Sequence, residues 1–151
     1  MLLKSIKLTN FRQYRGEQLV EFSCDPEKNV TVILGDNTSG KTTFVQAFKW
    51  ALYGSTSFST RDVMLNNPGD EEKVEVEINL EHDNTEYFII RSQDYSCNVK
   101  GVVDPSFTNI QVLRKMEDGQ TQIIDDKNKI ESTINKILPE DLSSYFFFDG
   151  E

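Results

Sequence analysis

The stretch VTVILGDNTSGKTTFVQAFKWALYG, residues 30–54, decides the fold, because three distinct patterns follow one another in it without a break. Val30–Leu34 is a continuous, largely β-branched apolar run, which is typical of a strand buried on both faces. Lys41–Tyr53 repeats apolar residues at helical spacing, and Gly54 is suited to the position just after a helix. The stretch therefore predicts a strand, a loop and a helix in direct succession.

The loop between them, GDNTSGKT at residues 35–42, matches the pattern G-x-x-x-x-G-K-[ST] at every fixed position. Glycine lets the chain leave the strand sharply and lets the backbone come close to phosphate. Backbone N–H groups at a helix N-terminus form a cradle for anions. We expect Lys41 to reach the β- and γ-phosphates of ATP, Thr42 to bind Mg²⁺ and Thr43 to bond the α-phosphate. The predicted nucleotide-binding residues of this segment are Gly35, Asp36, Asn37, Thr38, Ser39, Gly40, Lys41, Thr42 and Thr43.

The helix that follows the loop carries its apolar residues on one stripe. We expect this stripe to pack on the sheet and to form core, rather than to stack on a ligand. Trp50 lies off the stripe, so partial burial is expected for it, with a partner contact as the alternative. The stripe consists of Phe44, Ala47, Phe48, Ala51 and Leu52.

Outward from this unit the sequence predicts a β-rich antiparallel region. Val74–Leu80 alternates apolar and polar residues, which indicates a half-exposed strand. Turn residues at Asp83-Asn84 and Asp118-Gly119 predict two hairpins. Residues 55–72 are polar and predict a loop. The strands expected besides Val30–Leu34 are residues 3–11, 18–23, 74–80, 86–91, 110–115 and 120–124.

The C-terminal quarter predicts helices. Asp125 or Asp126 is suited to cap a helix that Pro139 stops, and a second short helix is expected to begin at that proline. The sequence therefore predicts one compact α/β domain. The buried positions of the first of these helices are Ile130, Ile134, Ile137 and Leu138.

Composition sets limits on partners and location. The net charge of −9 argues against a chain that coats nucleic acid over its whole surface. Basic residues at 4, 7, 12 and 15 leave open either a basic face or a solvated strand edge. No run approaches the ~20 apolar residues of a membrane span, so we expect a cytoplasmic protein with Cys24 and Cys97 reduced. His82 has no cysteine or histidine neighbours and gives no case for a metal site.

Four segments resemble one family. LLKSIKLTNFRQYRG at the start, then EFS and NVTVILGDNTSGKTTFVQAFKWALYG, and the closing YFFFDGE are similar to the N-terminal part of SMC-like ABC-type ATPases. Within that group the resemblance is nearest to the DndD-type ATPases of DNA sulfur modification and related phage-defence ATPases. It implies a P-loop NTPase of the ABC/SMC head type. Residues 1–151 would form its N-terminal lobe, with the C-terminal lobe and the coiled coil absent.

The resemblance also implies roles for residues outside the glycine loop. Arg12 matches an arginine near the nucleotide phosphates, and Asn37 matches an asparagine near the γ-phosphate. Thr38 stands where many relatives have glycine. Asp149 is placed where other members have the glutamine that contacts Mg²⁺ and the attacking water. Glu151 is the alternative for that role, and solvated terminal acids are the plain alternative for both.

The implied function depends on parts that this sequence lacks. No apolar run ends in two acids, and no S-G-G signature or late switch histidine is present. In the family these lie in the C-terminal lobe. We therefore expect ATP binding here, and hydrolysis after completion by that lobe and head-to-head homodimerisation. The work would be directed at DNA, with modification or defence proteins as further partners and no membrane. The alternatives are a non-hydrolysing, nucleotide-dependent regulatory module and a transporter nucleotide-binding domain, against which the N-F-R start argues.

Overall fold

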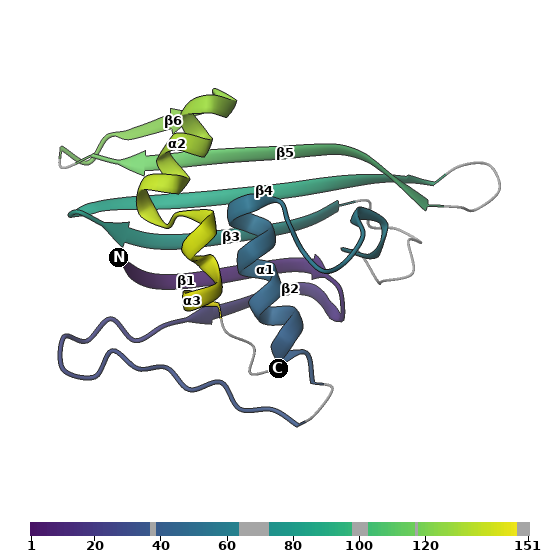
Figure 1. Ribbon diagram of the computed structural model, residues 1–151, viewed down its shortest axis with the longest axis horizontal. Helices are drawn as coiled ribbons and strands as arrows, with labels where there is room; N and C mark the ends of the chain where they lie inside the picture. The colour runs from purple at the N-terminus through teal and green to yellow at the C-terminus, as the bar shows by residue number, and fades with distance from the viewer. Residues whose placement is uncertain (37–38, 64–72, 98–102, 117, 148–151) are drawn as a thin grey trace.

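The computed structural model describes residues 1–36, 39–63, 73–97, 103–116 and 118–147. Within these ranges one antiparallel sheet has the strand order β2-β1-β3-β4-β5-β6 (Figure 1). The strands are β1 (Leu2–Phe11), β2 (Tyr14–Glu21), β3 (Lys73–His82), β4 (Thr85–Cys97), β5 (Val103–Lys115) and β6 (Thr121–Ile124). The helices are α1 (Lys41–Tyr53), α2 (Lys127–Ile137) and α3 (Ser143–Phe146), with 3₁₀ turns η1 (Thr60–Val63) and η2 (Glu140–Leu142).

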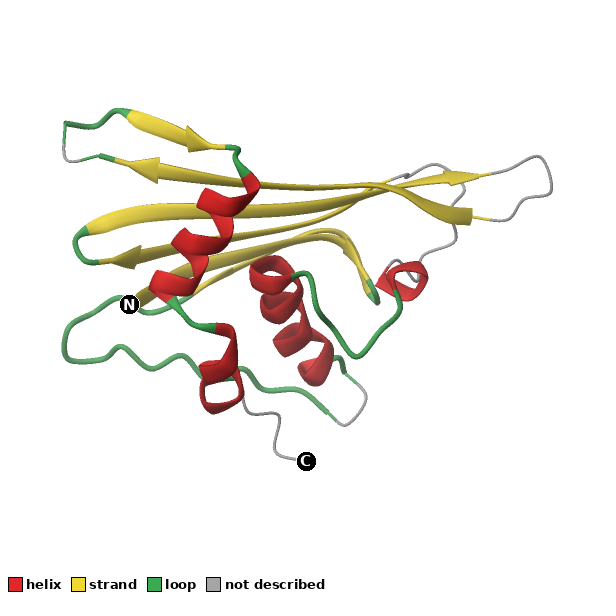
Figure 2. Cartoon of the chain, turned by 45° about the horizontal axis from the view of Figure 1, so that its top comes forward, coloured by secondary structure: helices red, strands yellow, loops and turns green. Residues whose placement is uncertain are grey.

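The helices lie on one face of the sheet, as Figure 2 shows. Most of the strand residues that face them are apolar and buried, so the core lies between the sheet and α1 and α2. Strict alternation in β3 produces this division, since successive side chains of a strand point to opposite faces. The central sheet residues of the core are Ile6, Leu8, Val74, Val76, Ile78, Ile89 and Val112.

The predicted hairpins are confirmed. Asp83 and Asn84 have φ values of 49° and 57°, the left-handed pair that a two-residue hairpin turn requires. Gly119 has φ 82° between β5 and β6. Both β4 and β5 are longer than the predicted strands 86–91 and 110–115. The sequence does not predict the added residues, Ser92–Cys97 and Val103–Asn109, because they are largely polar and lack a clear alternation. Pro105 is tolerated in β5 because β6 pairs only from Val112 onward, which leaves the proline on an edge.

The prediction for α1 is confirmed, and one expectation about it is wrong. The helix ends at Gly54, which has φ 73° and whose N–H donates to the Trp50 carbonyl oxygen. Trp50 is buried rather than partly exposed, with its ring 5.6 Å from that of Phe11. The reason is that the ring of Phe11, at the end of β1, packs against Trp50, so α1 buries more of its circumference than the predicted stripe.

The C-terminal helices follow the prediction closely. Asp126, not Asp125, caps α2, and its carboxylate accepts from the Lys129 N–H at 2.9 Å. The three isoleucines of α2 are buried on the sheet, and Leu138 is buried with them. Pro139 precedes the 3₁₀ turn η2 and α3 follows at Ser143, so the second helix begins later than expected.

The strand predicted at Val30–Leu34 is wrong for this chain. The segment is not part of the sheet and runs along its lower side in Figure 1, with Val32 72% and Leu34 88% exposed. The physical reason is that a strand forms only where another strand accepts its hydrogen bonds, and composition does not reveal where that partner lies.

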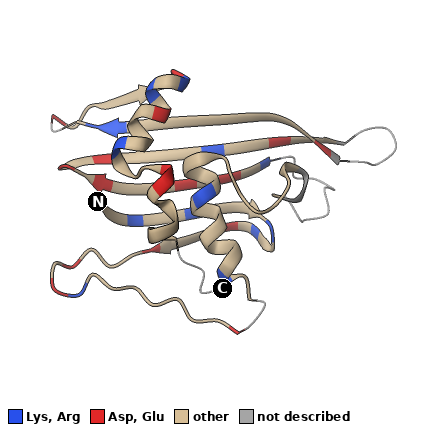
Figure 3. Cartoon of the chain, viewed as in Figure 1, with Lys and Arg blue, Asp and Glu red and all other residues tan. Residues whose placement is uncertain are grey.

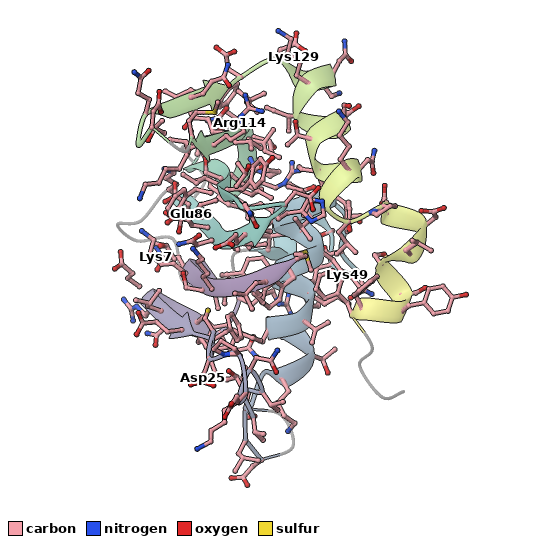
Figure 4. The ribbon with its side chains drawn as sticks, turned by 90° about the vertical axis from the view of Figure 1, so that its left-hand side faces the viewer. Lys7, Asp25, Lys49, Glu86, Arg114 and Lys129 are labelled. Carbon is pink, nitrogen blue, oxygen red and sulfur yellow. The ribbon has the colours of Figure 1, made fainter. Side chains whose placement is uncertain are left out.

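Two of the four basic residues near the N-terminus, Lys4 and Lys7, do not form a basic face, because both are paired with acids. The Lys4 ammonium lies 3.1 Å from carboxylate oxygens of both Glu81 and Glu86, and that of Lys7 lies 3.5 Å from Glu77. Figure 3 shows basic and acidic residues interspersed on the strands. Figure 4 shows Lys7 and Glu86 on the face of the sheet that points away from the helices. The pairing therefore neutralises this face.

Candidate functional site

The glycine loop enters α1 through a tight, glycine-dependent bend. A Cβ atom on Gly35 would stand 2.3 Å from the Ser39 hydroxyl oxygen, so the backbone at Gly35 lies close against the Ser39 side chain. The Ser39 N–H donates to the Asp36 carbonyl oxygen at 3.1 Å. Gly40 has φ 101°, and its carbonyl oxygen accepts from the Phe44 N–H at 2.8 Å, which is the first hydrogen bond of α1. The chain thus presents the N-terminus of α1 directly after the bend.

The Lys41 side chain folds back over this loop. Its ammonium donates to the carbonyl oxygens of Gly35 at 2.7 Å and Asp36 at 2.8 Å. Lys41 and Thr42 are exposed, whereas Thr43 is buried. A cation, an accessible hydroxyl and the positive end of a helix therefore lie together, which is an arrangement that favours a bound anion.

The turn between β1 and β2 contacts the loop, which the sequence did not predict. The Tyr14 hydroxyl donates to the Gly40 carbonyl oxygen at 3.0 Å. Its ring lies edge-on to that of Phe44 at 6.4 Å. Burial raises the pKa of Tyr14 above the ordinary value of 10.0, so the hydroxyl, a donor at neutral pH like that of any tyrosine, keeps its proton to a higher pH than an exposed one. Contacts this far apart in sequence leave no local pattern by which to find them.

Arg12 lies on the same turn, next to Gln13. Its backbone N–H donates to the Val63 carbonyl oxygen at 2.9 Å, and its guanidinium stands 4.1 Å from the centroid of the Phe58 ring. The turn that carries Arg12 therefore reaches both the glycine loop and the segment after α1.

The C-terminal segment packs beside α1. The Phe147 ring stacks on that of Phe48 with centroids 5.6 Å apart, while Phe146 is exposed. A hollow of about 450 Å³ beside α1 is lined by these rings together with Lys41 and Ile33. The predicted residues Asn37, Thr38, Asp149 and Glu151, and Phe148, lie outside the described residues.

The donor set at the loop fits a magnesium nucleotide. In the described part of the chain no three His, Cys, Asp or Glu residues gather to hold a metal ion. Mg²⁺ in phosphate sites does not need such a group, because it takes substrate phosphates, waters and one or two protein oxygens. The exposed Thr42 hydroxyl at the N-terminus of α1 can supply one such oxygen.

Among the described helices none is long and apolar enough to cross a bilayer.

The structure is that of an α/β protein. Helices cover one face of an antiparallel sheet, and a glycine loop leads into the first of these helices. The family model AAA_23, described as an AAA domain, matches residues 5–151. The chain belongs to this family. The family implies the use of ATP and typically Mg²⁺, and together with the relatives below it supports an SMC-like ABC-type ATPase head.

Several curated proteins are similar to parts of the chain. The "DNA double-strand break repair Rad50 ATPase" of Methanocaldococcus jannaschii is 32% identical over 94 residues, 62% of this chain and 9% of that protein. The protein of that name from Pyrococcus abyssi is 27% identical over 92% of this chain and 14% of its own length. The "DNA replication and repair protein RecF" of Clostridium kluyveri is 34% identical over 44% of this chain and 17% of its own length. The chain thus spans less than a fifth of each relative.

Proposed function

We propose that residues 1–151 are the N-terminal lobe of an SMC-like ATPase head that binds MgATP at the glycine loop. The observation that carries the proposal is the joint placement of the Gly35 bend, the Gly40 N-cap and the Lys41 ammonium at the start of α1. Backbone N–H groups there point out of the helix without intrahelical acceptors, and an anion can accept from them.

Each predicted residue has a distinct part in this proposal. The loop backbone from Gly35 to Gly40 cradles phosphate, and Lys41 exchanges its two carbonyl acceptors for phosphate oxygens. Thr42 supplies a hydroxyl to Mg²⁺, which when bound would screen the charge of the phosphates. Thr43, Arg12, Asp36, Asn37, Thr38 and Ser39 complete the nucleotide contacts, and Asp149, in preference to Glu151, approaches the metal and the attacking water.

We further propose that a C-terminal lobe of the same protein completes the head. The apolar run at residues 30–34 is exposed, and so are Tyr145 and Phe146 beside the 450 Å³ hollow. Exposed β-branched residues in an extended segment suit pairing with strands from another part of the protein. Two completed heads would dimerise around ATP, and a coiled coil would follow Glu151.

The work of the complete protein is proposed to be directed at DNA. The relatives' names, which refer to DNA double-strand break repair and to DNA replication and repair, support this direction. Repair, DNA modification and phage defence all belong to the proposal, with a DndD-like role in DNA sulfur modification as its specific form. DNA would contact the completed dimer, because this lobe carries a net charge of −9. A cytoplasmic location is part of the same proposal.

ATP hydrolysis by the full-length protein is the test. We expect turnover that rises when double-stranded DNA is added, and loss of turnover in Lys41→Ala. ATP binding without turnover would instead support the non-hydrolysing regulatory module. An unchanged rate in Lys41→Ala would contradict the proposed site.

A further inference from the structure

The turn between β1 and β2 is built with unusual backbone geometry. Asn10, near the end of β1, and Arg12, in the turn, have φ values of 55° and 53°, a region that non-glycine residues rarely adopt. Asn10 is buried, and its side chain accepts from the Gly16 N–H at 2.8 Å and donates to the Lys73 carbonyl oxygen at 3.3 Å. The surrounding contacts therefore hold a strained turn in one shape.

The strained turn is directed at the glycine loop. The Tyr14 hydroxyl bonds the Gly40 carbonyl oxygen, as described above. The Gln13 amide nitrogen lies 2.3 Å from the point where a Cβ atom on Gly40 would stand. The missing Cβ of Gly40 therefore lets the Gln13 amide come close to the backbone of the glycine loop. Gln13 is exposed, and its amide stands beside Gly40 at the N-terminus of α1, where the phosphates are proposed to lie.

We infer that Gln13 is a nucleotide-binding residue, whose amide N–H groups donate to the phosphates of bound MgATP. Tyr14 is the residue that holds the turn against the loop. This inference rests on the proposed function, because it adds a contact from the β1–β2 turn to the same phosphate site. The strained backbone at Asn10 and Arg12 then lies directly beside the residues that contact the proposed nucleotide.

The inference makes a prediction about the sign of charge. A carboxylate at position 13 would stand beside a polyanion and repel it, whereas an ammonium would attract it. A side chain that only packs against Gly40 would respond to size and not to sign. Charge effects at an exposed site also weaken with salt, because the Debye length falls from about 10 Å at 0.1 M to about 3 Å at 1 M.

The experiment measures MgATP affinity of the full-length protein for Gln13→Glu and Gln13→Lys at low and high salt. We expect Gln13→Glu to bind about tenfold more weakly and Gln13→Lys as tightly as wild type or up to about threefold more tightly. Both differences should shrink at about 0.5 M salt. Gln18→Glu and Gln18→Lys make the same charge changes on β2, about 15 Å along the hairpin, and should bind as wild type does.

The outcomes separate this inference from the proposed function. Equal weakening by Gln13→Glu and Gln13→Lys, or wild-type affinity in both, would overturn the role of Gln13. If wild type binds MgATP and Lys41→Ala does not, the proposed function stands in those cases and the inference alone fails. If wild type does not bind MgATP, both fail together.

Discussion

The Tyr14 hydroxyl and the Phe44 N–H donate to the same acceptor, the carbonyl oxygen of Gly40, at 3.0 Å and 2.8 Å. The Phe44 bond is the first helical bond of α1, so the β1–β2 hairpin and the helix bond the same oxygen atom, where the glycine loop enters α1. The position of the loop therefore depends on the hairpin of the sheet as well as on its own sequence.

Tyr14→Phe removes only the hydroxyl of this contact and keeps the ring beside Phe44. Because Gly40 keeps its helical bond, we expect a loss of about 1 kcal/mol in the free energy of unfolding. We also expect MgATP binding to weaken about threefold to tenfold, because the loop gains freedom. Urea unfolding and equilibrium binding measure the two effects. Tyr145→Phe, at an 82% exposed tyrosine, is the control, and equal behaviour of the two variants would contradict the prediction.

Gly40→Ala tests the close approach of the turn. The new Cβ would stand 2.3 Å from the Gln13 amide nitrogen and 3.0 Å from the Tyr14 hydroxyl oxygen, at a backbone φ of 101°. We expect loss of nucleotide binding by more than about tenfold, besides a backbone cost of about 1–2 kcal/mol. Gly119→Ala carries a similar φ of 82° with nothing within 4 Å, so it should cost stability and spare binding. If both variants bind nucleotide equally well, the contact with the turn has no part in the site.

The other end of α1 is held by Arg91. Its guanidinium donates to the carbonyl oxygens of Ala51 at 3.1 Å and Leu52 at 3.3 Å, and burial lowers its pKa to about 10. Cations at a helix C-terminus stabilise the last carbonyl groups. We expect Arg91→Met to lower the free energy of unfolding by about 2 kcal/mol. Chemical denaturation of Arg91→Met and of the exposed Arg15→Met gives the comparison, and a loss no greater than that of Arg15→Met would refute this role.

Tyr53 predicts a specific alkaline transition. Burial, with the charge of Glu140 second, raises its pKa from 10.0 to about 12, and its hydroxyl donates to the Leu138 carbonyl oxygen at 3.0 Å. The folded state favours the protonated phenol, so its contribution is complete below pH 10 and is lost as the pH rises toward about 12. We expect the melting temperature of wild type to fall relative to that of Tyr53→Phe across this window. A difference that stays constant from pH 8 to about pH 12 would contradict the assignment.

Local chemistry explains what the sequence could predict. Asp83 and Asn84 tolerate a left-handed backbone, and the β3–β4 hairpin that they predict is present. The apolar spacing of α1 predicts that Phe44 and Phe48 are core residues, and both are buried. Each of these features depends on residues close together in the chain.

Contacts between distant segments explain the features that the sequence does not predict. Tyr14 meets Gly40 across 26 positions, and Arg91 meets Ala51 across 40, and no periodicity records either pair. Trp50 is buried and not partly exposed, because Phe11 of β1 packs against its ring from a distant part of the sequence. The run at residues 30–34 has the composition of a buried strand but is exposed, because composition does not say whether the described residues supply a neighbouring strand.

That run yields the last prediction. Val32 is 72% exposed, so Val32→Asp should change the free energy of unfolding of residues 1–151 by no more than about 0.5 kcal/mol. In the full-length protein the proposed C-terminal lobe would bury the same position, and an unpaired carboxylate there would cost several kcal/mol. We therefore expect the full-length Val32→Asp protein to lose ATP turnover while residues 1–151 with the same change remain folded.

Val76→Asp is the matched control, because Val76 is fully buried in β3 and its replacement should unfold both forms. Circular dichroism of residues 1–151 and ATPase rates of the full-length protein separate the cases. Wild-type turnover in full-length Val32→Asp would show that nothing covers the run in the working protein. Unfolding of residues 1–151 by Val32→Asp would show instead that the run packs within the lobe itself. Only a loss confined to the longer protein agrees with a strand that takes its partner from outside residues 1–151.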